Sequence, residues 1–291
     1  MTWLDTIILS IVEGITEFLP ISSTGHMIIA SSILGIGEDE FVKLFEIVVQ
    51  LGAILSVVVL YWKKFFDFSR KDFYLKLIVA VLPALVIGKL LAKTIDKFLE
   101  SPLVVALALL IGGIILLFVE NLFKNNTIDH EKDMSYQKGL MVGFWQVLAM
   151  IPGTSRSAAT IVGGLQQNLT RRFAAEFSFF LAVPTMFAAT AYKMYEAYKH
   201  HPELLKDKHN LMVLGVGNII AFVVAMIAIK TFIHFLQKNG LRVFGFYRII
   251  AAGVIFLLMY QGIIKKEDKQ QSDLKPKVSV YQASTNAIAF R

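Results

Sequence analysis

The chain has 291 residues, of which 56% are hydrophobic and 18% are charged, and its formal net charge is +7. A composition this apolar excludes an ordinary water-soluble domain and predicts an integral membrane protein. The basic residues lie mainly in short loops and in the tail, which indicates membrane topology and lipid headgroup contact, with no nucleic-acid partner. The absence of cysteine excludes disulfides and thiolate metal sites.

The first predicted element is an apolar stretch, Trp3–Ile36, that is interrupted by a polar string at Pro20–Gly25. Backbone at membrane depth must satisfy its own hydrogen bonds, so such a break is tolerated only where it is buried in protein or lines a cavity. We therefore expect two half-helices that form a re-entrant hairpin. A second stretch, Gly139–Leu169, is broken in the same way at Pro152–Ser155.

Six further apolar runs follow these two hairpins, three after each. Each run has about 20 residues, which is enough to cross a hydrocarbon core of roughly 30 Å. The predicted fold class is therefore an all-α polytopic membrane protein with six full transmembrane helices and two re-entrant helical hairpins. The expected crossings are Phe41–Trp62, Phe73–Ala92, Pro102–Phe123, Phe173–Tyr195, Leu211–Leu236 and Phe244–Ile264.

The two polar breaks also match each other. Pro-x-Ser-Ser at residues 20–23 corresponds to Pro-x-Thr-Ser at residues 152–155, an offset of 132 residues. Three crossings per hairpin is an odd number, which forces the second half to insert upside down as an inverted-topology repeat. We expect one integral membrane domain over residues 1–264, with repeat 1 at about 1–123 and repeat 2 at about 139–264, and a polar, disordered tail at 265–291.

Loop charge sets the expected orientation of the molecule. The loops that follow Trp62, Phe123, Leu169 and Leu236 are rich in lysine and arginine, so we expect them on the cytoplasmic side. The first hairpin and both termini then face the outside, although the basic residues of the tail from Lys265 favour the opposite placement.

The first hairpin concentrates ionisable and hydroxyl side chains, which are costly inside a membrane and usually functional. Glu13 and Glu17 lie four residues apart and share a helix face. Two such carboxylates suit a divalent cation or a general base, and the alternative is that they bond neighbouring helices. His26 follows Ser23 by three residues and suits a proton donor, a group that orients the hydroxyl, or a nucleophile.

Each broken segment also predicts an anion site at its tip. A hydroxyl of Ser22, Ser23 or Thr24 is expected to cap the following half-helix, whose free N–H groups then point to the protein centre. The second tip adds Arg156, whose planar fork fits phosphate oxygens, and a structural salt bridge to Glu17 or Glu13 is the alternative.

Two further groups of residues complete the predicted site. Residues at the tips are expected to bind substrate, and polar residues inside crossings are expected to support the site or, alternatively, to pack helices. The first group is Ser22, Thr24, Gly153, Thr154, Ser155 and Ser157, and the second is Glu46, Gln50, Glu176 and Arg248.

Two strings, Glu13–His26 and Ile151–Ser157, strongly resemble the two signatures of the undecaprenyl-diphosphatase family, also called bacitracin-resistance proteins. Ala174–Phe179 and Phe246–Arg248 resemble further family segments, so the resemblance covers most of the chain, without the tail. The chain departs from the family pattern at Ala158, where the family usually has glycine.

The resemblance implies hydrolysis of undecaprenyl diphosphate to undecaprenyl phosphate and inorganic phosphate in the bacterial inner membrane. This reaction recycles the lipid carrier of cell-wall synthesis and gives bacitracin resistance. The family likeness implies Glu17, Ser23, His26 and Arg156 as the catalytic set, with Glu13 and Glu17 as ligands of magnesium or calcium. It also implies a polyprenyl diphosphate lipid as partner, and the orientation expected from loop charge would let this lipid enter from the outer side of the bilayer.

A second function class stays open at this point. Inverted repeats with broken helices near the midplane are a transporter's plan, so a transporter or flippase of a lipid phosphate is the alternative. Whether the chain forms a homo-oligomer is also left open.

Overall fold

The computed structural model describes residues 1–67, 69–99 and 101–264, and the predicted tail at 265–291 lies outside them. These residues form helices and connecting loops, and an isolated parallel bridge joins Ile128 to Leu169. The coarse prediction of an all-α membrane protein is therefore confirmed.

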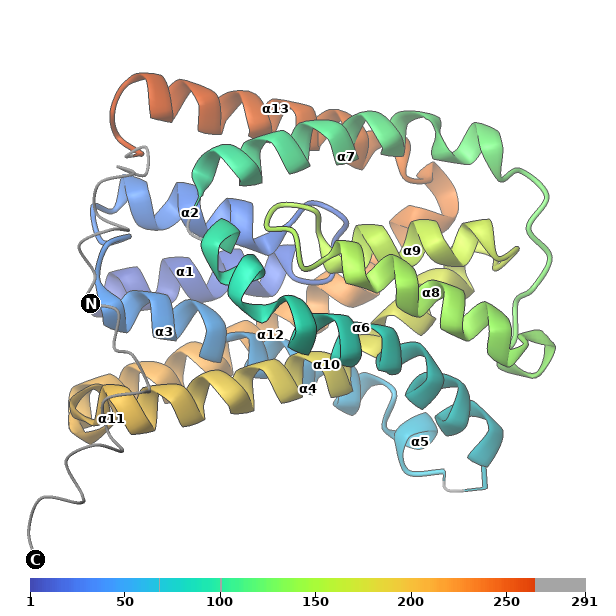
Figure 1. Cartoon of the computed structure of the whole chain (residues 1–291), viewed down its shortest axis with the longest axis horizontal. Coiled ribbons are helices and arrows are strands. Elements are labelled where there is room, and N and C mark those ends of the chain that lie inside the picture. Colours follow the sequence, from blue (N-terminus) through green and yellow to red (C-terminus); the bar gives the residue numbers. More distant parts are fainter. Residues whose placement is uncertain (68, 100, 265–291) are drawn as a thin grey trace, which may run out of the picture.

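The helices follow one another with short connections (Figure 1). They are α1 (Trp3–Thr16), α2 (Ser23–Ile33), α3 (Glu40–Val48), α4 (Gln50–Leu60), α5 (Trp62–Phe65), α6 (Lys71–Leu99), α7 (Pro102–Leu122), the 3-10 turn η1 (Glu131–Asp133), α8 (Tyr136–Leu148), α9 (Arg156–Gln166), α10 (Arg171–His200), α11 (Pro202–Lys206), α12 (Lys208–Asn239) and α13 (Arg242–Tyr260).

Five helical stretches of the described residues are long and apolar enough to cross a membrane. They coincide with five of the six expected crossings, while the sixth, Phe73–Ala92, lies within α6, which is not among the five. The five stretches are Glu40–Leu60, Pro102–Leu122, Arg171–His200, Lys208–Asn239 and Arg242–Tyr260.

Short polar residues begin several of these helices. Thr2 and Asp5 form a capping box at the start of α1, in which the Thr2 N–H donates to the Asp5 carboxylate at 2.7 Å and the Asp5 N–H donates to the Thr2 hydroxyl at 3.2 Å. Asp39 and Asp207 cap α3 and α12 in a similar way through their carboxylates. These caps satisfy N–H groups that a helix leaves free at its first turn.

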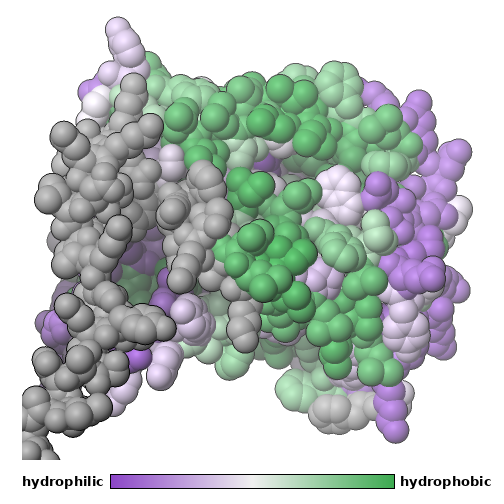
Figure 2. Space-filling model, viewed as in Figure 1, coloured by the Kyte–Doolittle hydropathy of each residue, from purple (hydrophilic) through white to green (hydrophobic). Residues whose placement is uncertain are grey.

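The surface is apolar across the middle of the molecule. Figure 2 shows a broad hydrophobic face with a hydrophilic end on the right. Large apolar side chains such as Ile111 and Phe118 of α7 and Ile78 and Leu82 of α6 are exposed. An apolar face of this extent is unfavourable in water and fits contact with lipid.

Three pairs of helices pack extensively against each other. Helix α1 lies against α12 and α8 lies against α6, while α7 and α13 pack along each other. The connections that follow α4, α7, α9 and α12 gather at one end of the molecule, on the right in Figure 1, and the N-terminus and α11 lie at the other. The two broken hairpins, α1–α2 and α8–α9, meet with their tips between these ends.

Candidate active site

Both hairpin tips turn at a serine with a left-handed backbone. Ser22 (φ 70°, ψ 98°) and Ser155 (φ 70°, ψ 114°) are the N-caps of α2 and α9. Their hydroxyl oxygens accept hydrogen bonds from the backbone N–H groups of Gly25 at 3.4 Å and Ala158 at 3.3 Å. Because a positive φ is uncommon outside glycine, each tip relies on surrounding contacts to hold this conformation.

The observed helix caps shift the alignment of the two tips by one residue from the alignment that the sequence predicts. By cap position Ser22 corresponds to Ser155, an offset of 133 residues, whereas the sequence strings paired Ser23 with Ser155. The second turn holds one extra residue after its proline, and Gly153 there has φ +86°. The first helical residue is consequently Ser23 in one hairpin and Arg156 in the other.

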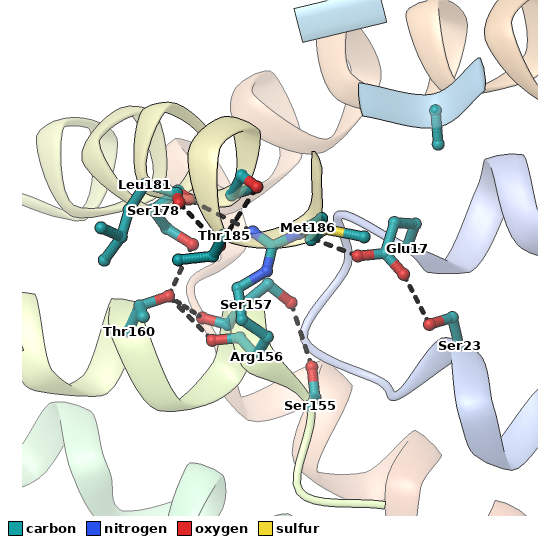
Figure 3. A network of polar contacts seen from close by, with 12 residues as sticks. Glu17, Ser23, Ser155, Arg156, Ser157, Thr160, Ser178, Leu181, Thr185 and Met186 are labelled. Carbon is teal, nitrogen blue, oxygen red and sulfur yellow. Dashed lines mark hydrogen bonds and ion pairs between the residues drawn. The ribbon is translucent and has the colours of Figure 1, made fainter. Parts of the chain in front are cut away.

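Glu17 joins these two first helical residues (Figure 3). Its Oε1 accepts a hydrogen bond from Arg156 Nη2 at 2.8 Å, and its Oε2 accepts one from Ser23 Oγ at 2.6 Å. The side chains of Glu17 and Arg156 are only 6% and 12% exposed, so removal of either charge would leave the other buried and unpaired. The structure thus brings together three of the four residues predicted as the catalytic set.

Arg156 has further partners that sequence reasoning missed. Nη1 donates to the Ser178 carbonyl oxygen at 3.2 Å, Nη2 contacts Met186 Sδ at 3.0 Å, and the guanidinium lies 5.5 Å from the Phe18 ring centroid. Its buried Nε has no hydrogen-bond partner among the described residues. Ser178 belongs to the segment Ala174–Phe179, which the family likeness had already marked, so only its carbonyl role was unforeseen.

Arg248 is fully buried and binds backbone carbonyls. Its Nη1 atom contacts both hairpin tips, because it donates to Thr154 O at 2.9 Å and to Pro20 O at 3.3 Å. The remaining bonds run from Nη2 to Gly153 O at 3.0 Å, from Nη2 to Ala108 O at 3.0 Å and from Nε to Leu109 O at 3.4 Å.

The guanidinium of Arg248 therefore fastens the two tips to α7. Gly112 of α7 leaves room for it, because a Cβ at that position would collide with Arg248 Nη2. The five carbonyl bonds compensate the burial of a permanent charge that has no carboxylate in contact within the described residues.

His26 has different partners from the rest of the predicted catalytic set. Its Nδ1 lies 2.7 Å from the Ser22 carbonyl oxygen, and its Nε2 lies 2.7 Å from the Tyr247 hydroxyl. In the described part of the chain no hydrogen bond joins His26 to Glu17, Ser23 or Arg156. Tyr247 was not expected at the site, although it adjoins Arg248 in a segment that the family likeness singled out.

Glu13 lies next to this network, close to the carboxyl group of Glu17. Its side chain is fully buried, and both carboxylate oxygens have no partner among the described residues. Glu17 and Glu46 are the acidic neighbours that interact with it electrostatically. The described residues contain no group of three or more acidic or histidine side chains arranged to hold a metal ion.

The hydroxyl groups of the second tip hold the two hairpins together. Ser157 Oγ donates to the Leu19 carbonyl oxygen at 2.7 Å, and Ser155 Oγ reaches the same oxygen at 3.5 Å. In the first tip, by contrast, Thr24 is exposed. Expected substrate contacts at Ser155 and Ser157 therefore coincide with a structural contact between the tips.

Two of the expected supporting residues, Glu176 and Gln50, make no hydrogen bond to Glu17 among the described residues. Glu176 accepts a hydrogen bond from Lys64 Nζ at 2.9 Å and so joins α10 to α5 in an ion pair. Gln50 begins α4 and is partly buried. For Glu176 this arrangement corresponds to the helix-packing alternative that the sequence left open.

Known proteins resemble the chain over most of its length. The profile of the family "Bacitracin resistance protein BacA" matches residues 6–254. An undecaprenyl-diphosphatase of Flavobacterium psychrophilum is 58% identical over 260 residues, which cover 89% of this chain and 97% of that protein. An undecaprenyl-diphosphatase of Bdellovibrio bacteriovorus is 50% identical over 264 residues, which cover 90% of this chain and 98% of that protein.

Proposed function

Because the chain belongs to the bacitracin resistance protein BacA family, we propose the activity of its relatives as its function. The protein is a membrane undecaprenyl-diphosphatase, which hydrolyses undecaprenyl diphosphate to undecaprenyl phosphate and inorganic phosphate. The observation that carries this function within the structure is the buried chain of contacts from Ser23 through Glu17 to Arg156.

Ser23 is the nucleophile in this proposal and Glu17 is its general base. The 2.6 Å bond from Ser23 Oγ to Glu17 Oε2 puts a carboxylate where the hydroxyl proton must go during attack. Ser23 Oγ bonds to the terminal phosphorus, the bond from that phosphorus to the bridging oxygen breaks, and undecaprenyl phosphate leaves. Water then adds to the phosphoserine phosphorus, H₂PO₄⁻ leaves, and Oγ takes back its proton from Glu17.

Arg156 and the two helix N-termini stabilise the charge of the transferred phosphoryl group. The unpartnered N–H at Arg156 Nε is a donor that is already desolvated. Helices α2 and α9 begin at adjoining tips, so both direct free N–H groups and positive dipole ends to the same region. Fixed donors in a dry site stabilise developing charge more than the same donors in water.

The proposal includes a divalent cation, magnesium or calcium, at Glu13 and Glu17. Glu13 fits this role because it supplies two buried oxygens that have no hydrogen-bond partner in the described residues. Hard cations take six or more oxygen ligands, so substrate oxygens and water are needed beside two carboxylates. Such a cation, when bound, offsets the negative charge of the diphosphate.

The proposed membrane arrangement is six crossings and two re-entrant hairpins in an inverted repeat. It is supported by the equal φ of Ser22 and Ser155, and by the pairing of α1 with α12 and of α8 with α6. The basic connections gather at one end, which favours a cytoplasmic location of that end. The site is proposed to open to the opposite, periplasmic side.

Ser23→Ala is expected to lower phosphate release from undecaprenyl diphosphate by roughly a thousandfold or more, because it removes the attacking atom. The measurement uses purified protein in detergent, where no two sides exist for transport. Ser56→Ala is the matched control, since this buried hydroxyl of α4 donates to the Ala53 carbonyl oxygen. Full turnover by Ser23→Ala would exclude the serine mechanism.

Rapid acid quenching of wild-type protein with labelled substrate is expected to leave an acid-stable label on Ser23. An acid-labile label on His26 would instead make the imidazole the nucleophile. Repeating the assay with a chelator tests the cation, whose removal should abolish turnover and whose return should restore it. Tight binding of lipid phosphate without any phosphate release would favour the transporter.

A further inference from the structure

His26 and Tyr247 form a hydrogen-bonded pair between α2 and α13. Besides the 2.7 Å contact from His26 Nε2 to the Tyr247 hydroxyl, the two rings are stacked, with centroids 5.4 Å apart and planes only 7° from parallel. The proposed mechanism assigns no task to either residue. Their geometry nevertheless restricts what the imidazole can do.

The partners of His26 decide where its hydrogens are. The Ser22 carbonyl oxygen can only accept, so Nδ1 at 2.7 Å must carry a hydrogen. In the neutral ring the lone pair is therefore on Nε2, and the Tyr247 O–H donates to it. In the protonated ring Nε2–H donates to the phenol oxygen. Neither state leaves a free lone pair on the imidazole.

The backbone around Tyr247 holds the phenol in this place. The next residue, Arg248, is fully buried and donates to carbonyls of both tips, including Pro20 O just before the cap at Ser22. Tyr247 itself is 44% exposed. The phenol thus connects a ring of the first tip with the exterior of the protein, on the α13 side.

We propose that Tyr247 is a positioning residue for His26: its hydroxyl occupies the Nε2 lone pair, so that the imidazole acts as a proton carrier and not as a nucleophile. The inference rests on the proposed phosphatase function. In the proton transfer, the phenol passes its hydrogen to Nε2 and takes another from the H₂PO₄⁻ product. In the reverse direction, Nε2–H returns its hydrogen to the phenol oxygen while the phenol releases its own hydrogen to solvent, and the imidazole is neutral again.

Labelling with diethyl pyrocarbonate tests the pair without reference to activity, because this reagent acylates an imidazole nitrogen that has a free lone pair. Tyr247→Phe keeps the ring and removes only the O–H, so steric cover of His26 is preserved. We expect His26 to be labelled roughly fivefold faster in this variant, as measured by peptide mass spectrometry. Equal rates in wild type and variant would overturn the proposal.

Two references make the labelling quantitative. Tyr260→Phe changes a tyrosine at the far end of α13 that is 89% exposed, and it should leave the rate at His26 unchanged. His209, whose Nε2 lies 3.1 Å from the Met1 carbonyl oxygen, should be labelled at one rate in all variants. Faster labelling of His209 together with His26 would indicate a general loosening and would contradict the proposal.

Turnover supplies the second readout. Tyr247→Phe is expected to lower kcat roughly fivefold to tenfold with KM unchanged, and to have no further effect in a His26→Ala background. Multiplying losses in the double variant would overturn the coupling. If wild-type protein releases no phosphate, the phosphatase function fails, while the labelling result still decides whether Tyr247 holds Nε2.

Discussion

Glu17→Gln is expected to lower kcat for phosphate release, measured per mole of folded protein, by at least roughly a thousandfold. The amide keeps the shape of the side chain but cannot take the proton of Ser23, whose Oγ lies 2.6 Å from Glu17 Oε2. It also leaves the buried charge of Arg156 without its 2.8 Å carboxylate partner. The measurement is single-turnover phosphate release in detergent.

A matched glutamate provides the control. Glu176→Gln removes a carboxylate that also accepts from a cation at 2.9 Å, but its partner is Lys64 of α5. We expect turnover of this variant within about twofold of wild type. A similar collapse in both variants would mean that loss of either ion pair disables the protein, and the role of Glu17 as base would lose its support.

Arg248→Lys is expected to cost about 2–5 kcal/mol of stability, because an ammonium has three donors and cannot reach five separate carbonyl oxygens. The unpaired carbonyls belong to both tips, so activity should fall together with stability. The thermal unfolding midpoint in detergent is expected to drop by roughly 5 °C or more.

A pair of glycine variants tests the same clamp from the opposite helix. Gly112→Ala places a Cβ against Arg248 Nη2 and should lower both the unfolding midpoint and turnover. Gly253→Ala adds the same methyl group on α13, where no atom lies within 4 Å of the new Cβ, so it should change neither. Wild-type turnover of Gly112→Ala would argue against a clamp that depends on this close approach.

The sequence predicted those parts of the site that consist of polar residues within apolar segments. The breaks at Pro20 and Pro152 predicted two hairpins, and the charge of Arg156 suggested a phosphate, Glu17 or Glu13 as its partner. The structure has the Glu17 pair at 2.8 Å. These features are local, because the burial cost of a charge or a broken helix can be judged from a single segment.

Contacts to backbone carbonyls were not predictable in this way. Arg248 was named as a supporting residue, but its partners at Pro20, Gly153 and Thr154 are peptide oxygens, which every residue type offers. The separation of His26 from Glu17 has the same origin, since the Ser22 carbonyl fixes Nδ1. The partner of Glu176 was equally unpredictable, because Lys64 of α5 is more than a hundred residues away in the sequence.

The position of Arg248 in the last described helix also determines the order in which these contacts form during biosynthesis. The first tip leaves the ribosome with residue 20 and the second with residue 155, yet the side chain that fastens both arrives only with α13, the last helix of the described chain. Until that helix has entered the bilayer, Pro20 and Thr154 lack their common donor. The contact that holds both tips together can therefore form only after α13 has been synthesised and inserted.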